Sequence, residues 1–262
     1  MTITLAVGLV LGCLIGFIGG YAGIGGAPFL VAFLVMGLGF NQYMAQGTVL
    51  AVMLGPMSLL GVYQMRDRIK LLIPYILIGV LTYATCSYVG ARGAYMINEE
   101  LLQTIFGCVL LALGLFEMLR PTQKDQPLMP LNAGGLTVGQ KALIPTNMWT
   151  FSLVGILVGM AGGFLGIGAG VLMVPIFVNL FKIHKDDARA MSLAILLPPV
   201  SLGAVIHYAE KDAINWMMAL LIFITYFSTN YFGARLGRKH SSQQFKKYYG
   251  AIMIVLSQVY II

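Results

Sequence analysis

The chain has 262 residues, of which 59% are hydrophobic and only 10% are charged, and its mean hydropathy is +0.87. Such a composition excludes an ordinary soluble domain. Residues 1–65 and residues 142–181 contain no Asp, Glu, Lys, Arg or His. Charge-free stretches of this length are typical of segments in the hydrocarbon core of a membrane, where each ionised side chain is costly. The net charge of +7 therefore indicates basic cytoplasmic loops rather than nucleic-acid binding.

Ten hydrophobic segments follow one another along the chain, and several are about 20 residues long, enough for a helix to span a bilayer. In the first half they cover approximately residues 3–22, 27–40, 45–64, 71–91 and 101–119. In the second half they cover approximately residues 147–165, 170–181, 189–208, 214–235 and 247–262. The second segment of each half is short, which predicts a half-helix or a re-entrant piece. The segments together predict an all-α polytopic membrane protein.

The regions around these segments complete the predicted organisation. The N-terminal segment has no basic flank, so we expect a membrane segment rather than a cleaved signal peptide. Residues 120–146 contain several prolines and a Gly-Gly pair, which predicts a polar linker between membrane repeats at residues 1–119 and 147–262. The three cysteines form no CxxC pair, and we expect small apolar side chains rather than a redox or metal site. The sequence predicts no cofactor.

A glycine-rich motif occurs twice, at residues 16–26 (GFIGGYAGIGG) and at residues 159–169 (GMAGGFLGIGA), with an offset of 143 residues. The same offset aligns Thr82-Tyr83 with Thr225-Tyr226. Over the aligned residues 12–92, roughly 25 of about 81 paired positions are identical, against about a tenth by chance. The protein is therefore a duplicated unit.

The basic residues indicate how the two repeats are oriented. If each repeat crosses the membrane an odd number of times, the second is inverted, and loops on one side hold 14 of the 16 Lys and Arg residues. Only Arg92 and Lys211 then lie on the other side. With four crossings per repeat, 7 of these Lys and Arg residues would lie on one side of the membrane and 9 on the other. The positive-inside rule therefore predicts inverted repeats with a cytoplasmic linker and the N-terminus outside, an architecture characteristic of secondary transporters.

The glycine motifs are expected to interrupt helices at membrane depth, where unpaired backbone is tolerated only beside a cavity or inside protein. Glycine permits a tight turn and lets backbone amides approach a ligand, and Pro28 suits the first turn of a new helix. The short segments would then present free N–H groups to a small anion. The alternative is that these glycines only allow close helix packing. We prefer the anion site, because the pattern is both clustered and duplicated.

The duplicated Gly-x-x-Gly-Gly-x-x-Gly-Ile-Gly pattern, followed by Val174-Pro175 in the second copy, resembles the TauE/SafE family of sulfite and organosulfonate exporters. Residues 45–50 (AQGTVL) and 188–193 (ARAMSL) are similar to a downstream Ala-x-x-Thr-Ser-Leu element of that family. The resemblance covers nearly the whole chain. It implies a multi-pass permease of the bacterial cytoplasmic (inner) membrane that moves sulfur-containing anions such as sulfite, sulfoacetate or thiosulfate.

Candidate substrate-binding residues lie in the two motifs and in the stretches that follow them. They are Gly23, Gly25, Gly26, Gln46, Thr48, Gly166, Gly168, Ala169, Arg189 and Ser192. Their hydroxyl and amide groups can donate hydrogen bonds to anion oxygens, and helix capping or interhelical bonding is the alternative for each. Arg92 and Arg235 are candidates for attracting anions into the two vestibules, with interfacial anchoring as the alternative. His207 is a gating candidate, with a surface or packing role as the alternative.

The predicted function is transport of a small sulfur-containing anion, with export as the direction, by alternating access between the two repeats. A passive anion channel of the same fold is the alternative. An intramembrane enzyme ranks below both, because the sequence contains no HExxH motif, no paired carboxylates and no Ser/His arrangement. The expected partners are the anion and the lipid bilayer, and the sequence predicts no oligomeric state.

Overall fold

The computed structural model describes residues 2–22, 26–119, 148–168, 170–179, 181, 185–237 and 243–261, and these residues form helices without strands. The first copy contributes α1 (Thr2–Ala22), α2 (Ala27–Leu38), α3 (Gln42–Val52), α4 (Leu59–Gln64), α5 (Arg66–Ala94) and α6 (Glu99–Leu119). The second copy contributes α7 (Met148–Leu165), α8 (Gly170–Asn179), α9 (Lys185–Ile195), α10 (Leu202–Glu210), α11 (Trp216–Gly237) and α12 (Gln243–Ile261). The predicted linker lies outside the described residues. The all-helical fold that the hydrophobic segments predict is confirmed.

A helix ends within the glycine-rich motif in both copies. α1 ends at Ala22 and α2 begins at Ala27, with Pro28 in its first turn. α7 ends at Leu165 and α8 begins at Gly170. At 12 and 10 residues, α2 and α8 are too short to span a hydrocarbon core of about 30 Å at roughly 1.5 Å per residue. The sequence therefore predicts correctly that the segment after each motif is short.

The third predicted segment of each copy consists of two helices instead of one. Residues 45–64 are divided between α3 and α4, and residues 189–208 between α9 and α10. Pro56 lies between the first pair and Pro198-Pro199 between the second, and proline ends a helix because it has no N–H to donate. The Ser201 hydroxyl joins the second turn to α3 by donating to the Leu50 carbonyl at 3.1 Å. Counting only hydrophobic segments therefore underestimates the number of helices.

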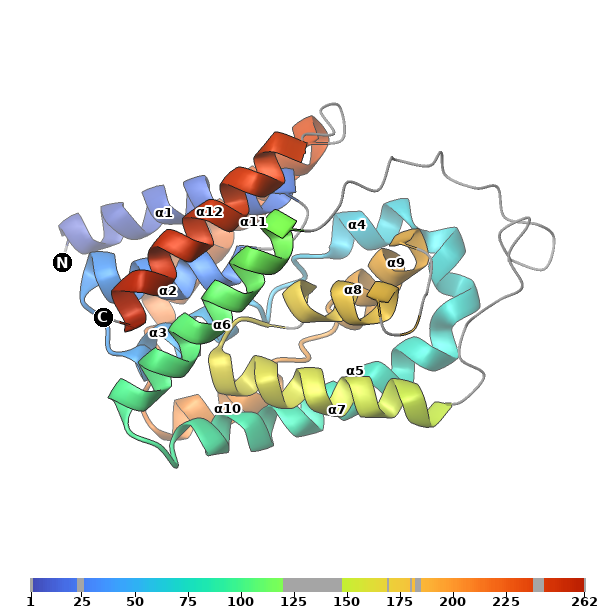
Figure 1. Cartoon of the computed structure of the whole chain (residues 1–262), viewed down its shortest axis with the longest axis horizontal. Coiled ribbons are helices and arrows are strands. Elements are labelled where there is room, and N and C mark those ends of the chain that lie inside the picture. Colours follow the sequence, from blue (N-terminus) through green and yellow to red (C-terminus); the bar gives the residue numbers. More distant parts are fainter. Residues whose placement is uncertain are drawn as a thin grey trace.

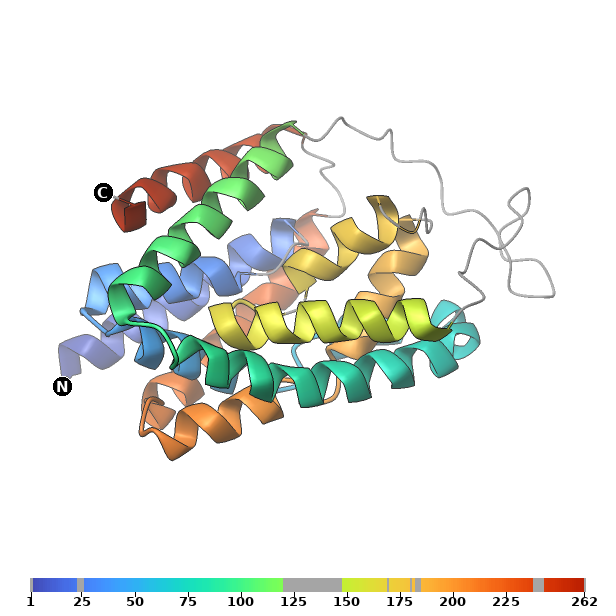
Figure 2. The ribbon, with the colours of Figure 1, turned by 60° about the horizontal axis from the view of Figure 1, so that its bottom comes forward.

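The first helix of each copy packs along the long helix of the other copy: α1 along α11, and α7 along α5 (Figures 1 and 2). Residues related by the offset of 143 make matching contacts in the two helix pairs. A Cβ added at Gly16 would lie 2.7 Å from the Tyr226 Cα, and one added at Gly159 would lie 2.9 Å from the Tyr83 Cα. These glycines at the start of the motif therefore allow close helix packing, the role that the sequence analysis gives as its alternative.

The last helices of the two copies, α6 and α12, pack against each other. They run across the front of the molecule in Figure 1 and lie along its upper side in Figure 2. The stretch Leu72–Ala94 of α5 and the whole of α6 are long and apolar enough to cross a membrane. Further apolar helical stretches are shorter: Ala6–Tyr21, Ala27–Leu38, Phe151–Leu165 and Gly250–Ile261. Large apolar side chains such as Leu81 and Val255 are exposed on these helices, as expected for surfaces in contact with lipid.

Candidate functional site

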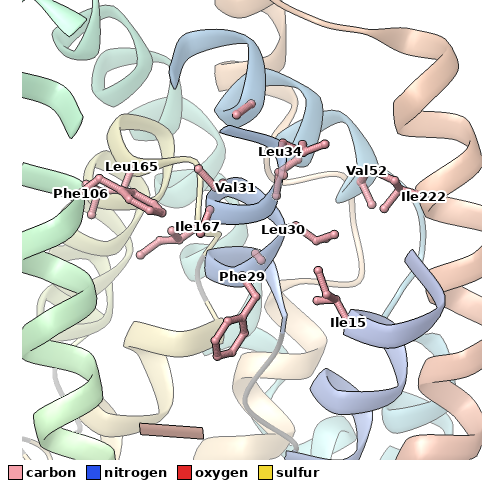
Figure 3. Packing of buried hydrophobic residues seen from close by; sticks show 14 of the residues in the cluster. Ile15, Phe29, Leu30, Val31, Leu34, Val52, Phe106, Leu165, Ile167 and Ile222 are labelled. Atoms are coloured by element: carbon pink, nitrogen blue, oxygen red, sulfur yellow. The ribbon is translucent and has the colours of Figure 1, made fainter. Parts of the chain in front are cut away.

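The interruption between α7 and α8 is a left-handed turn. Gly166 and Gly168 both have a φ of +69°, a conformation that costs other residues roughly 1–2 kcal/mol. The Gly166 N–H still donates to the Gly162 carbonyl at 3.0 Å, so helical hydrogen bonding continues up to the turn. Between the two glycines, Ile167 is 1% exposed and belongs to an apolar cluster with Val31 of α2 (Figure 3). The turn of the second copy is therefore buried against the short helix of the first copy.

Gln46 of α3 lies directly against this turn. A Cβ added at Gly166 would be 2.6 Å from the Gln46 Cβ and 2.8 Å from its Cα, so only glycine fits there. The Gln46 side chain is fully buried, and its Oε1 accepts a hydrogen bond of 2.7 Å from the Tyr208 hydroxyl of α10. Its Nε2 has no hydrogen-bond partner among the residues that the structure describes. The sequence assigns Gln46 and Gly166 to one site, and the structure brings them into contact.

Tyr83 of α5 provides a second buried polar group near the same turn. Its side chain is 1% exposed, and its hydroxyl lies against Gly162, which is one helical turn before Gly166. This hydroxyl has no hydrogen-bond partner within the part of the chain that the structure describes. Most buried polar side-chain atoms are hydrogen-bonded, so two unsatisfied groups beside one turn require an explanation.

Tyr226 of α11 corresponds to Tyr83 in the other copy, but its hydroxyl is hydrogen-bonded. It accepts from the Gly26 N–H at 3.1 Å, at the residue that precedes α2. A Cβ added at Gly19, the counterpart of Gly162, would lie 2.8 Å from this hydroxyl. The contact between tyrosine and glycine therefore recurs in both copies, whereas among the described residues only the Tyr226 hydroxyl has a hydrogen-bond partner.

Thr48 and Ser192, two further candidates, are buried on α3 and α9. The Thr48 hydroxyl accepts a hydrogen bond of 3.1 Å from the Asn215 N–H at the start of α11. Asn215 in turn caps α11, since its Oδ1 accepts from the Met218 N–H at 3.0 Å. Thr48 therefore makes the kind of interhelical bond that the sequence analysis names as its alternative role.

His207 lies inside an aromatic cluster instead of on the surface. Its side chain is edge-on to the Tyr95 ring at 5.3 Å, and its Nδ1 is 3.5 Å from the exposed Glu210 carboxylate. The Tyr95 ring also packs against Tyr208 at 5.5 Å. Tyr95 follows the end of α5, and burial is the main cause that raises its pKa to about 12, so its hydroxyl is protonated at neutral pH. The cluster extends from the hydrogen bond between Tyr208 and Gln46 to an exposed carboxylate.

The remaining candidates are only partly described. Arg92 is exposed in the last turn of α5, a position that suits a vestibule or an interfacial anchor. Arg189 belongs to α9 and Arg235 to α11, but their side chains lie outside the described part of the chain. Gly23, Gly25 and Ala169 lie outside the described residues altogether. Their assignment to the site stays a prediction.

Tyr83 and Tyr208 are the residues near the turn that the sequence analysis does not select. For Tyr83 a signal existed, because the Thr-Tyr pair recurs in both copies and a repeated hydroxyl near a repeated glycine motif is a candidate donor. For Tyr208 there was none. Its counterpart under the offset is Met65, and its partner Gln46 is 162 residues away in the chain.

Comparison with known proteins identifies relatives over nearly the whole chain. The family described as "Sulfite exporter TauE/SafE" matches residues 5–260. A "Probable membrane transporter protein" of Xylella fastidiosa strain Temecula1 is 25% identical over 267 residues, which cover 100% of this chain and 95% of that protein. The Bacillus subtilis "Probable membrane transporter protein YunE" is 26% identical over 243 residues, 88% of each chain. A similarly named protein of Methanocaldococcus jannaschii is 24% identical over 265 residues, 95% of this chain and 92% of that protein. No solved structure matches significantly.

Proposed function

Because the chain belongs to the sulfite exporter TauE/SafE family, whose relatives are named as membrane transporters, we propose that it exports a small sulfur-containing anion. Sulfite, sulfoacetate and thiosulfate are the candidates. The observation that supports this best is the Gln46 Nε2 at the Gly166–Gly168 turn, which has no partner among the described residues, since an amide N–H donates to anion oxygens. α8 begins directly after this turn, and the first N–H groups of a helix have no partner within it and favour negative charge. Such a site binds an anion without a buried cation.

Alternating access between two inverted repeats is the proposed mechanism. The division of 14 basic residues against 2 supports the inverted orientation. The helix contacts are reciprocal, since α1 of one copy packs on α11 of the other and α7 packs on α5, which supports a two-fold relation between the copies. Two such units can rock relative to each other around a site between them and open it to each side in turn. The proposed location is the bacterial inner membrane, with the linker in the cytoplasm and the N-terminus outside.

Transport by proteoliposomes tests the substrate. We expect saturable uptake of at least one of sulfite, sulfoacetate and thiosulfate from a panel that also contains sulfate and taurine. An alternating-access carrier should also accelerate labelled efflux when unlabelled substrate is added on the opposite side. Uptake that does not saturate and shows no such acceleration would instead support a passive channel, and no uptake of any sulfur anion would contradict the proposed substrate class.

Site-directed labelling tests the topology. Single cysteines in residues 66–70 and in residues 210–212 should react with a membrane-impermeant thiol reagent from opposite sides. Both positions suit the method, because Arg66 and Asp67 begin α5 with side chains 60% and 76% exposed, and Glu210 is 55% exposed at the end of α10. The background must lack Cys13, Cys86 and Cys108, since all three are free thiols. Labelling of both positions from the same side would rule out the inverted orientation.

A further inference from the structure

The two matched tyrosines, Tyr83 and Tyr226, differ in what surrounds their hydroxyl groups. Both lie against a glycine of the motif, Gly162 for Tyr83 and Gly19 for Tyr226. The Tyr226 hydroxyl accepts from the Gly26 N–H, whereas the Tyr83 hydroxyl has no partner among the described residues although the side chain is 1% exposed. Leaving a buried hydroxyl unsatisfied costs about 1–3 kcal/mol, which a ligand acceptor would offset.

We propose that Tyr83 and Gln46 together bind the anion at the second glycine turn, whereas at the equivalent position of the first copy the Gly26 N–H, a donor that an anion there would need, is bonded to the Tyr226 hydroxyl. The duplicated protein then has one working anion half-site instead of two equivalent ones. This inference rests on the proposed function, because it names the residues that recognise the transported anion.

The two donors contact glycines that lie close together at the end of α7. Gly162 and Gly166 are four residues apart, and the Gly166 N–H donates to the Gly162 carbonyl at 3.0 Å, so the two glycines are separated by about one helical turn, ~5.4 Å. The Tyr83 hydroxyl lies against the first of these glycines and the Gln46 side chain against the second. An anion with several oxygens at the turn could then accept hydrogen bonds of about 2.9 Å from both side chains.

Tyr208 is the positioning residue of this half-site. Its hydroxyl donates to the Gln46 Oε1 at 2.7 Å and lies 3.4 Å from the Gly163 carbonyl of α7. This bond engages the acceptor end of the amide, and the donor end, Nε2, has no partner within the described part of the chain, so it is available to a ligand. A ligand at this half-site must therefore supply acceptors, which favours an anion with several oxygens over a group such as the ammonium of taurine.

The test compares Tyr83→Phe with the matched variant Tyr226→Phe, using sulfite as the probe. We expect Tyr83→Phe and Gln46→Leu each to raise the KM for sulfite about 10- to 100-fold, the loss typical of a hydrogen bond to a charged group.

The thermal unfolding temperature separates the two tyrosines. Tyr83→Phe should not lower it, because the Tyr83 hydroxyl makes no bond within the described protein. Tyr226→Phe should lower that temperature, since Gly26 loses its acceptor, and should leave the KM within about twofold. Tyr208→Phe should raise the KM less than Gln46→Leu.

Two readouts separate this inference from the proposed function. The first is flux, and the second is the rise in unfolding temperature on adding sulfite or, as non-sulfur oxyanions, phosphate and nitrate.

The outcomes of these two measurements differ for the two proposals. Wild-type flux with an unchanged KM in Tyr83→Phe and Gln46→Leu would overturn the half-site and leave the proposed function standing. Equal KM increases in Tyr83→Phe and Tyr226→Phe would also overturn it, because they indicate two equivalent half-sites. A sulfite-induced temperature rise that Tyr83→Phe abolishes, without flux in the wild type, would support the half-site and contradict the function. No rise with any anion would overturn the half-site.

Discussion

Gly166→Val is expected to abolish transport while the protein still inserts into the membrane. Valine at a φ of +69° is strained, because its branched Cβ meets the backbone in the left-handed region. The new Cβ would also collide with Gln46, whose backbone Cα lies 2.8 Å from that position. Overpacking of this kind typically costs about 1–3 kcal/mol, which a membrane helix bundle can tolerate. The displaced Gln46 amide could no longer donate to the anion, so flux should fall to the background of empty liposomes.

Two further variants serve as controls for this prediction, Gly168→Val for backbone strain and Gly37→Ala as a neutral substitution. At Gly168 an added Cβ would approach only the flexible end of the Met53 side chain, so this variant tests backbone strain with little collision. At Gly37 of α2 nothing lies within 4 Å of an added Cβ, and alanine should leave flux unchanged. Membrane yield and the unfolding temperature report whether each variant has folded. Wild-type flux in folded Gly166→Val would contradict the prediction and indicate that this glycine acts only in helix packing.

An interior-negative membrane potential should drive anion efflux without a proton gradient. A potential of 100 mV contributes about 2.3 kcal/mol per charge, equivalent to roughly a 50-fold concentration ratio. Proton-coupled carriers usually hold Asp, Glu or His inside the bilayer. Among the described carboxylates, Asp67, Glu100, Glu210 and Asp212 are exposed, Glu99 and Asp187 are half-buried, and Glu117 on α6 is buried. Glu117, the exception, lies two residues before the end of α6, so we expect potential alone to support uphill export.

Proteoliposomes in which ionophores set the potential and the pH gradient separately measure this effect. If efflux ignores the potential and a pH gradient alone drives uphill accumulation, the prediction is wrong. Glu117 and His207 are then the residues to replace, since both are buried and titratable. Glu117→Gln should be compared with Glu100→Gln, which changes an exposed carboxylate at the other end of the same helix. Loss of pH coupling only in Glu117→Gln or His207→Asn would identify the proton carrier.

The glycine motif combines two roles that the sequence analysis treats as alternatives. Gly16 and Gly159, in its first part, lie within helices and allow α1 and α7 to approach α11 and α5 closely. Gly166 and Gly168, in its last part, form the left-handed turn beside Gln46. Close packing is therefore the role at the start of the motif, and the turn with its unsatisfied donors is the feature that supports an anion site.

Several features of this protein follow from the sequence by itself. Composition determined the membrane class, because charge-free stretches longer than a bilayer span have no other stable environment. The repeated motif predicted both helix interruptions and the short helices after them, since glycine and Pro28 act through local backbone geometry. Pro56 is also a local signal for the break between α3 and α4, because proline ends a helix. Hydrophobicity alone predicts one continuous segment there.

Only the tertiary structure decided which polar groups are satisfied. Tyr83 and Tyr226 are identical and occupy matched positions in sequence, yet among the described residues only Tyr226 reaches a backbone N–H. The bond from Tyr208 that orients Gln46 joins residues 162 apart, and the burial of His207 depends on how α10 packs against α5. Periodicity and motifs predict which face of a helix a residue occupies and where the backbone turns, because both depend on neighbours in the chain. The partner of a side chain depends instead on the packing of helices that are distant in the chain.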